Sequence, residues 1–323
     1  MHVFVTGASG FIGSVVVRQL LARGHSVRAF LLPGSPRTRL ANLAVEIAEG
    51  DVRDPASVER AMTGCQGVIH LASLSNWKDI DSPLMDAVVV EGTRHVLAAA
   101  RKLGGVRVVY VSSALAMNGT NAPVMQDESS PCTMEAGGYS YTRAKRAAEA
   151  LCQQAVKDGL AVMIVNPGEV YGPNDVERIT AGNLIDFAKS SPVLVCDGGT
   201  AVVHVDDVAA GMIAALERGR PGERYILAGE SLSVRAIAEL TLEIMGKKKR
   251  VLEFPNPIVR GLAWLGRNLK LPLPFDPHVI PYATKYWFVS GAKAERELGV
   301  KFRSARETLT PTVRWLEESG ALG

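Results

Sequence analysis

Tyr141 and Lys145 stand four residues apart in a stretch whose sequence favours a helix. Residues at this spacing lie on one face of a helix, so the phenol and the ammonium group would be neighbours. A nearby ammonium group favours the phenolate form and is expected to lower the pKa of the tyrosine. Tyr141 is therefore predicted to exchange a proton with an alcohol–carbonyl pair.

Three glycines near the start of the chain suggest a partner for this proton transfer. Gly7, Gly10 and Gly13 follow an apolar stretch over residues 2–6 and open an expected helix over residues 11–23. In a dinucleotide-binding turn the first glycine makes the tight turn and the second lets the backbone approach the pyrophosphate. The third lets the helix pack closely on the sheet. A nicotinamide dinucleotide would supply hydride while Tyr141 supplies the proton, so the two motifs together predict an oxidoreductase.

Strands and helices alternate through the first half of the chain, up to an expected strand over residues 161–165. This alternation predicts an α/β fold, a Rossmann doubly wound parallel sheet with right-handed crossovers. The second half is less regular and predicts a smaller C-terminal α+β cap that binds the substrate. We expect the dinucleotide-binding domain over residues 1–168, together with about 192–220, and the cap over residues 169–191 and 221–323.

Composition argues against several other classes of protein. The 323 residues are 47% hydrophobic and 21% charged, which suits a folded chain with a large core. The net charge of +3 gives no reason to expect a nucleic-acid partner. No apolar run reaches the roughly 20 residues of a membrane-spanning helix, and no signal peptide precedes the first strand. The four cysteines show no metal-ligand spacing, so we expect reduced thiols, no metal and a cytoplasmic location.

The end of the second expected strand bears on the choice of cofactor. Sites that prefer NAD place a carboxylate there for the adenosine ribose, whereas residues 31–34 read LLPG. Arg37 and Arg39 follow, and a guanidinium group can hold a 2′-phosphate. The alternative is that both arginines are solvated loop residues. We expect NADP, with NAD as the alternative, and assign Arg37 to the cofactor site.

Several short stretches match the motifs of one known family. They are TGASGFIG at residues 6–13, GDVRD at 50–54, LAS at 71–73, NPGEVYGP at 166–173, HVDDVA at 204–209, and the segments at 217–227 and 292–299. With Tyr141 and Lys145, they resemble the extended short-chain dehydrogenases/reductases, the NAD-dependent epimerase/dehydratase superfamily. The resemblance covers nearly the whole chain and is greatest to the dihydroflavonol-reductase-like branch.

The resemblance implies roles for individual residues. Ser113, Tyr141 and Lys145 match the catalytic serine, tyrosine and lysine of the family. Ala114 is the other register for the serine, but the chemistry needs a hydroxyl that holds the substrate oxygen. A plain strand-end capping role for Ser113 is the alternative. The implied cofactor contacts are Gly7, Gly10, Phe11, Ile12, Gly13, Asp51, Val52, Leu71, Ala72, Ser73, Tyr141, Lys145, Pro167 and Val170, besides Arg37.

Three positions depart from the patterns of the family. In its nucleotide-sugar enzymes an arginine that holds the substrate diphosphate corresponds to Thr200, and an asparagine of the NxYGP turn corresponds to Glu169. Val89 stands where the family often has an asparagine that supports the active-site network. A diphosphate needs cationic partners, so the first two departures argue against a nucleotide sugar. We expect an enzyme that interconverts a carbonyl and a secondary alcohol on a small or lipophilic substrate. The alternatives are a sugar epimerase/dehydratase with tightly held NAD and a non-catalytic dinucleotide-binding sensor.

A proline-rich stretch over residues 254–281 is strongly apolar. Its apolar residues include Leu262, Ala263, Trp264, Leu265, Leu269, Leu271, Leu273 and Phe275. The pattern favours the core of the cap, with a lipophilic substrate or a membrane surface as alternative partners. The basic run at residues 247–250 favours a solvated loop. Expected partners are a small-molecule substrate and, as a candidate assembly, a second copy in a homodimer.

Overall fold

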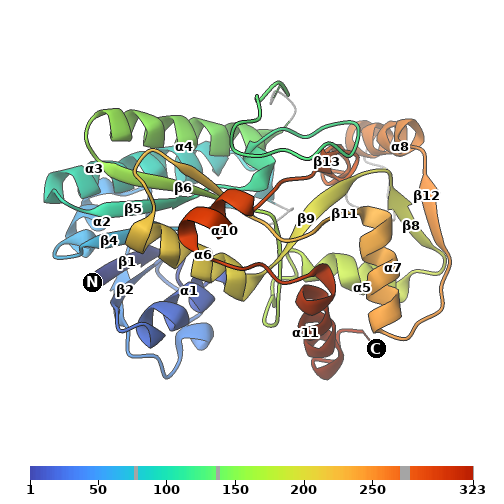
Figure 1. The fold of residues 1–323 in the computed structure, drawn as a ribbon, viewed down its shortest axis with the longest axis horizontal. Coiled ribbons are helices and arrows are strands. Elements are labelled where there is room, and N and C mark those ends of the chain that lie inside the picture. The colour runs from blue at the N-terminus through green and yellow to red at the C-terminus, as the bar shows by residue number, and fades with distance from the viewer. Residues whose placement is uncertain (76–78, 136–138, 270–276, 323) are drawn as a thin grey trace.

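Seven parallel strands form the main sheet of the structure, a computed structural model that describes all residues except 76–78, 136–138, 270–276 and 323 (Figure 1). The strands are β1 (His2–Thr6), β2 (Ser26–Leu31), β3 (Glu46–Glu49), β4 (Gly67–His70), β5 (Arg107–Val111), β6 (Ala161–Pro167) and β10 (Arg224–Leu227). Their spatial order is β3-β2-β1-β4-β5-β6-β10. Strands β1 to β3 therefore follow one another toward one edge of the sheet, and the strands from β4 onward follow one another toward the other edge. This is the predicted Rossmann doubly wound sheet.

Helices cover both faces of this sheet. On one face lie α1 (Phe11–Ala22) and α6 (Val205–Arg218), and on the other lie α2 (Pro55–Met62), α3 (Gly92–Leu103) and α4 (Ser140–Lys157) (Figure 1). Alternate side chains of β1 point to opposite faces, so Val3 and Val5 pack with α1 and α6 while Phe4 packs on the other side. Both faces of the central strands β1, β4, β5 and β6 are buried, which explains their apolar sequences, whereas the edge strand β3 is partly exposed.

A second lobe follows β6 and contains short strands with flanking helices. Its strands are β7 (Glu169–Tyr171), β8 (Val193–Cys196), β9 (Gly199–His204), β11 (Ser231–Ser233), β12 (Val251–Phe254) and β13 (Tyr286–Trp287). Its helices are α5 (Ala181–Lys189), α7 (Val234–Ile244), α8 (Asn256–Leu269), α9 (Ile280–Ala283) and α11 (Ala305–Glu318), while α10 (Ala292–Leu298) packs on α6 and β10. The core of the lobe lies between α5, α7 and α11.

The structure places two segments differently from the domain ranges expected from the sequence. The strand β10 belongs to the range expected in the cap, yet it pairs with β6 at the edge of the main sheet. The strand β8 belongs to the range expected in the dinucleotide domain, yet it pairs with β12. The division into two folding domains stays a prediction.

Two helical segments also differ from the sequence-based expectation. The expected helix over 83–103 begins as a π-helical turn, η3 (Asp86–Glu91), before α3, and Val89 is buried within that turn. The proline-rich stretch contains the helix α8, which was not predicted from the sequence because prolines usually interrupt helices. Pro257 lies in the first turn of α8, where a missing backbone N–H breaks no hydrogen bond within the helix.

Candidate active site

A cavity of about 740 Å³ lies at the carboxyl ends of the main-sheet strands, where the second lobe faces them. All the residues predicted to bind cofactor or to act in catalysis line this cavity, with the exception of Arg37. They are Gly7, Gly10, Phe11, Ile12, Gly13, Asp51, Val52, Leu71, Ala72, Ser73, Ser113, Tyr141, Lys145, Pro167 and Val170. Segments far apart in the sequence are thus brought to one site, as expected for parallel strands that end at the same edge.

The glycine turn connects β1 to α1 as the sequence predicts. Gly7 has a φ of +68°, a conformation that residues with a side chain rarely adopt. A Cβ atom at Gly13 would lie 2.1 Å from the carbonyl oxygen of Gly7, so the first turn of α1 can approach β1 only with glycine there. The N-terminus of α1 opens onto the cavity with free backbone N–H groups, which suit a pyrophosphate. A dinucleotide therefore fits this end of the cavity.

Thr6 and His70 hold the end of β4 beside the glycine turn. The Thr6 Oγ1 accepts hydrogen bonds from the backbone N–H groups of Leu71 and Ala72, both at 3.1 Å, and lies 2.7 Å from His70 Nδ1. Burial lowers the pKa of His70 to about 3, so the ring is neutral. The Thr93 hydroxyl donates to a backbone carbonyl and therefore accepts from His70 Nε2 at 3.1 Å. Thr6 consequently donates to Nδ1, and the Nε2–H tautomer completes the network.

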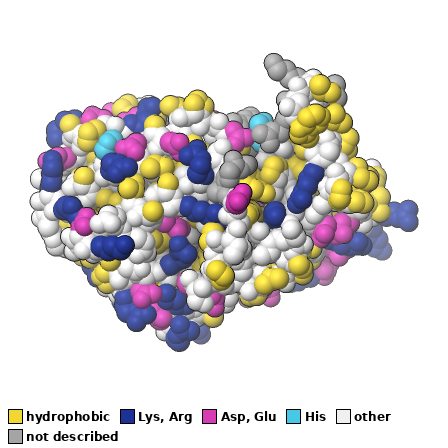
Figure 2. All heavy atoms as spheres, turned by 90° about the horizontal axis from the view of Figure 1, so that it is seen from above, with side chains coloured by type: hydrophobic (Ala, Val, Ile, Leu, Met, Phe, Trp, Pro, Cys, Tyr) yellow, Lys and Arg dark blue, Asp and Glu magenta, His cyan; other side chains and the backbone are white. Residues whose placement is uncertain are grey.

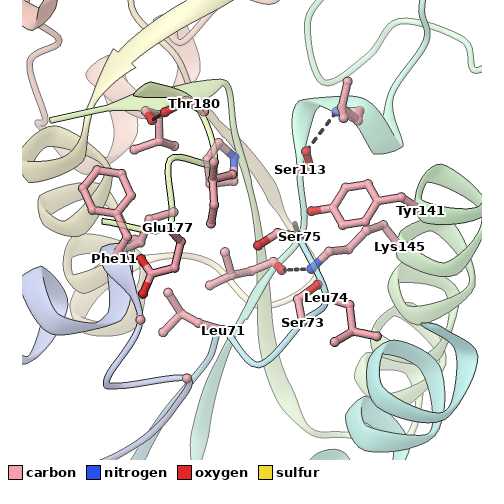
Figure 3. Close-up of a pocket in the computed structure, with 18 of the residues that line it drawn as sticks. Phe11, Leu71, Ser73, Leu74, Ser75, Ser113, Tyr141, Lys145, Glu177 and Thr180 are labelled. Atoms are coloured by element: carbon pink, nitrogen blue, oxygen red, sulfur yellow. Dashed lines mark hydrogen bonds between the residues drawn. The ribbon is translucent and has the colours of Figure 1, made fainter. Parts of the chain in front are cut away.

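Tyr141 and Lys145 lie on α4 with their polar atoms at the cavity (Figure 3). Burial raises the pKa of Tyr141 to about 12, although the hydroxyls of Ser113 and Ser73 act in the opposite direction. The expectation that Lys145 lowers this pKa is therefore wrong. The Lys145 Nζ lies 5.6 Å from the centre of the tyrosine ring and donates to the carbonyl of Val111 at 2.8 Å. Tyr141 is a phenol at neutral pH and can donate a proton.

Ser113 lies two residues after the end of β5, and its hydroxyl points toward Tyr141 (Figure 3). Its Oγ accepts a hydrogen bond of 3.1 Å from the backbone N–H of Leu115. The serine thus caps the short 3₁₀ turn η4 (Ala114–Ala116), as one alternative proposed, but its hydroxyl hydrogen stays available to an oxygen in the cavity. The side chain of Ala114 is buried in a core cluster, which favours the register that places the serine at Ser113.

A buried network behind Ser113 and Lys145 was not predicted from the sequence. Asn166 Nδ2 donates to the Ser113 carbonyl at 2.9 Å and to Glu149 Oε1 at 2.8 Å, and Glu149 forms an ion pair with Arg224. Burial lowers the pKa of Lys145 to about 8, and the nearby Glu149 carboxylate raises it in part. The spacing of four residues between Lys145 and Glu149 is the sequence signal that would have found this partner.

The opposite side of the cavity contains a buried carboxyl group, Glu169. Its Oε1 accepts hydrogen bonds of 2.8 Å from the Tyr171 hydroxyl and from Asn183 Nδ2. Burial raises the pKa of Glu169, while these hydrogen bonds and one from Thr200 oppose the increase. The two positions that depart from nucleotide-sugar enzymes, Glu169 and Thr200, are therefore in contact and line the same cavity.

Three arginine side chains lie near the end of the cavity beyond β2, and of these only Arg53 lines the cavity. Arg37 forms an ion pair with Glu49 on β3 and does not line the cavity. Arg39 donates to the Ser9 carbonyl at 3.1 Å and to Glu177 Oε1 at 2.9 Å, so it connects the glycine turn to the second lobe. Nearby, hydrogen bonds from the Arg53 guanidinium lower the pKa of Asp51. Arg37 and Arg39 have carboxylate partners that the sequence did not indicate.

Residues 3–228 match the family described as "NAD dependent epimerase/dehydratase family". The chain belongs to this family. Sterol demethylase protein B of Methylococcus capsulatus is 33% identical to it over 100% of both chains. The 4-hydroxy-2-methyl-3-oxo-4-farnesyl-3,4-dihydroquinoline-1-oxide ketoreductase of Stigmatella aurantiaca is 34% identical over 83% of this chain and 80% of the relative. The predicted family resemblance is thus confirmed.

Solved structures of the family have the same fold. The crystal structure of the UDP-glucose 4-epimerase of Thermus thermophilus in complex with NAD is 26% identical, with a TM-score of 0.77 over 98% of this chain and 99% of that chain. This epimerase/dehydratase family member is an NAD(P)-dependent reductase or dehydrogenase of the extended short-chain type. Among the described residues, no helix combines the length and apolar composition needed to cross a membrane, and no three His, Cys, Asp or Glu side chains gather as metal ligands.

Proposed function

We propose that this protein is an NADP-dependent reductase that converts a ketone or aldehyde group of a lipophilic substrate into an alcohol, or catalyses the reverse oxidation. The main support is the arrangement of Tyr141, Ser113 and Lys145 at one cavity with the glycine turn. The cavity wall near Tyr141 also includes Leu115 and Trp287. Apolar walls of this kind favour a substrate with a large apolar part.

The chemistry in this proposal follows from the hydrogen-bonding capacity of each side chain. The bound dinucleotide supplies hydride to the carbonyl carbon. The Tyr141 phenol donates its proton to the carbonyl oxygen, and the Ser113 hydroxyl donates a hydrogen bond to the same oxygen. Lys145 uses one N–H for Val111 and has two others for the nicotinamide ribose. Its positive charge stabilises the tyrosinate that the proton transfer leaves behind.

Glu169 and Thr200 are the reason for placing a nucleotide-sugar reaction second. A diphosphate that enters a buried site must exchange its water for cationic or N–H partners. One missing charge-assisted hydrogen bond weakens binding by roughly 1.5–3 kcal/mol, or about ten- to a hundredfold. A neutral ketone would not need the missing arginine. The likeness to UDP-glucose 4-epimerase is the observation that keeps an epimerase as the second candidate.

Steady-state assays would test this proposal directly. The loss of NADPH absorbance would be followed with a set of ketones and aldehydes that differ in the length of their apolar part. The expected result is turnover that increases with apolar length and disappears in Tyr141→Phe. Calorimetry with UDP-glucose in the presence of NAD or NADP is the counter-test. Micromolar binding of the nucleotide sugar, with no ketone reduced, would reverse the ranking of the two functions.

The cellular setting and the assembly are part of the same proposal. Cys65, Cys132, Cys152 and Cys196 are all free, which agrees with a reducing compartment, and we place the enzyme in the cytoplasm. A homodimer is the proposed assembly, and light scattering coupled to size-exclusion chromatography would measure it. A monomer by that measurement would leave the proposed reaction unaffected, because all the proposed catalytic groups come from one chain.

A further inference from the structure

The helix α8 exposes a stripe of large apolar side chains. Ile258, Leu262, Leu265 and Leu269 recur every third or fourth residue, so they follow one side of the helix. Between 37% and 60% of the surface of each of these residues is exposed. Single exposed leucines are common on proteins, but an ordered apolar stripe on one helix indicates a partner.

The stripe is distinct from the side of α8 that packs against the rest of the second lobe. Val259 and Ala263 are buried and pack against Ile280 of α9. The expectation that the apolar stretch forms the core of the cap is therefore correct for Ala263 and wrong for the stripe. Leu271, Leu273 and Phe275, which the sequence grouped with it, lie outside the described residues.

The strand that leads into α8 enlarges the exposed apolar surface. Leu252 of β12 pairs in register with Leu194 of β8, and both side chains are exposed, as is Phe254. Leu252 and Phe254 are two residues apart and so lie on the same side of the strand. Phe254 stands two residues before the start of α8, so the apolar surface continues along the chain.

Positive charge is concentrated in the same part of the chain. Residues 247–269 contain six Lys and Arg residues and one acidic residue, Glu253, whereas the whole chain has a net charge of +3. In the part of the chain that the structure describes, none of the ion pairs includes residues 247–250 or Arg260. Lys249 and Arg260 donate hydrogen bonds to backbone carbonyls instead. Figure 2 shows hydrophobic and basic side chains side by side at this end of the molecule.

We propose that the stripe of α8 and the basic residues 247–250 form a docking surface for a membrane that contains anionic lipid. An amphipathic helix buries its apolar side at the boundary of headgroups and acyl chains, while nearby Lys and Arg bind anionic headgroups. A second copy of this chain is a poorer occupant. A symmetric dimer through this surface would bring two strongly basic segments together, and like charges repel.

The position of α9 connects this surface to the cavity. Val279 and Tyr282 line the cavity, and Ile280, which lies between them in sequence, packs against α8. A docked α8 would therefore hold the substrate end of the cavity about one helix diameter, roughly 10 Å, from the lipid. A lipophilic substrate could then pass from the membrane to the cavity with little exposure to water. Docking itself does not depend on the proposed reaction.

Co-sedimentation with vesicles would test the docking surface. The full-length protein would be mixed with phosphatidylcholine vesicles, with or without phosphatidylglycerol. Binding is expected to the anionic vesicles and to weaken as salt increases. Leu265→Asn combined with Leu269→Asn, and separately Lys248→Glu combined with Arg250→Glu, should each weaken binding about tenfold or more. Val124→Asn with Met125→Asn is the matched control, because it replaces exposed apolar residues elsewhere.

Thermal unfolding of each variant would show that its fold is retained, since all the replaced side chains are exposed. The proposal is overturned if the unmodified protein does not bind anionic vesicles, or if the stripe variant binds them as well as the control does. The proposal would also be overturned if the unmodified protein bound no vesicles and the stripe variant had a lower molecular mass in solution than the unmodified protein. That result would assign the surface to a second copy of the chain.

Discussion

Glu149 lies one helical turn after Lys145 on α4, and both side chains are buried. Burial disfavours the ammonium form of Lys145, while the Glu149 carboxylate favours it, so the pKa of the lysine is lowered only to about 8. Glu149 is itself held by Asn166 and Arg224. The charge of the proposed catalytic lysine thus depends on Glu149, which is not among the described residues that line the cavity.

Replacement of Glu149 by glutamine should move the pH dependence of turnover. The neutral amide no longer favours the ammonium, so the pKa of Lys145 falls further below about 8. Activity that needs the charged lysine would then be lost at a lower pH than in the unmodified enzyme. The measurement is kcat/KM against pH, and an alkaline limb that stays in place would contradict the role of Glu149. Arg224→Gln is the control for simple disruption, because it leaves the carboxylate beside Lys145.

Replacement of Tyr141 by phenylalanine should lower turnover by about a hundredfold or more, the usual scale for a lost general acid. Cofactor affinity should change little, because the glycine turn and Lys145 remain. Tyr139→Phe is a matched control. Tyr139 is a neighbouring tyrosine whose hydroxyl donates to the Pro281 carbonyl at 3.3 Å. Turnover near that of the unmodified enzyme in Tyr141→Phe would exclude Tyr141 as the proton donor, whatever the control does.

The parts of the fold that could be predicted from the sequence are those with strong local patterns. Central strands of the main sheet such as β5 and β6 are apolar runs because both of their faces are buried, and the close approach of α1 to the glycine turn requires glycine at Gly13. The two-residue strand β13 lacks such a pattern. It is specified by pairing with a distant segment, as in the register of Trp287 with Thr200 of β9, which a local sequence pattern cannot show.

The candidate site likewise has features that local spacing predicts and features that depend on residues far apart in the sequence. Tyr141 and Lys145 share one helix, so their proximity follows from spacing alone. The pKa of Tyr141 depends on how deeply the helix is buried, and the expected direction was therefore wrong. Asn166 and Glu177 meet partners that are far away in sequence, and no motif marks those pairs.

Mild acid should destabilise the protein because of His70, which binds a proton more readily in the unfolded state than in the folded state. Its pKa is lowered to about 3 in the folded state, so the unfolded state binds the proton more tightly. The contribution of the neutral ring is fully present above a pH of about 6.5 and is lost as the pH falls, with a loss of about 2 kcal/mol at pH 5. Denaturant unfolding at pH 7 and pH 5 would measure this loss. In His70→Gln the loss should be smaller by about that amount, and an equal pH dependence in both proteins would contradict it.

Arg39 offers the sharpest test of the choice between NADP and NAD. Cofactor selection at this end of the cavity is proposed to rest on a guanidinium group, since β2 ends at Leu31 and is followed by Leu32, without a carboxylate. Arg39→Ala should weaken NADP by about tenfold, the scale of one charge-assisted hydrogen bond, and should affect NAD little. Fluorescence titration of both cofactors would measure the two affinities.

The ion pair of Arg39 with Glu177 makes a second variant necessary. If Arg39 only fastens the second lobe to the glycine turn, Glu177→Gln should weaken NADP and NAD by equal factors, and Arg39→Ala should do the same. If Arg39 binds the 2′-phosphate, Glu177→Gln should leave NADP binding intact or strengthen it, because the guanidinium loses a competing carboxylate. Arg37→Ala completes the set, since Arg37 pairs with Glu49 and does not connect the glycine turn to the second lobe as Arg39 does. An equal effect of Arg39→Ala on both cofactors would remove the phosphate contact from the proposal.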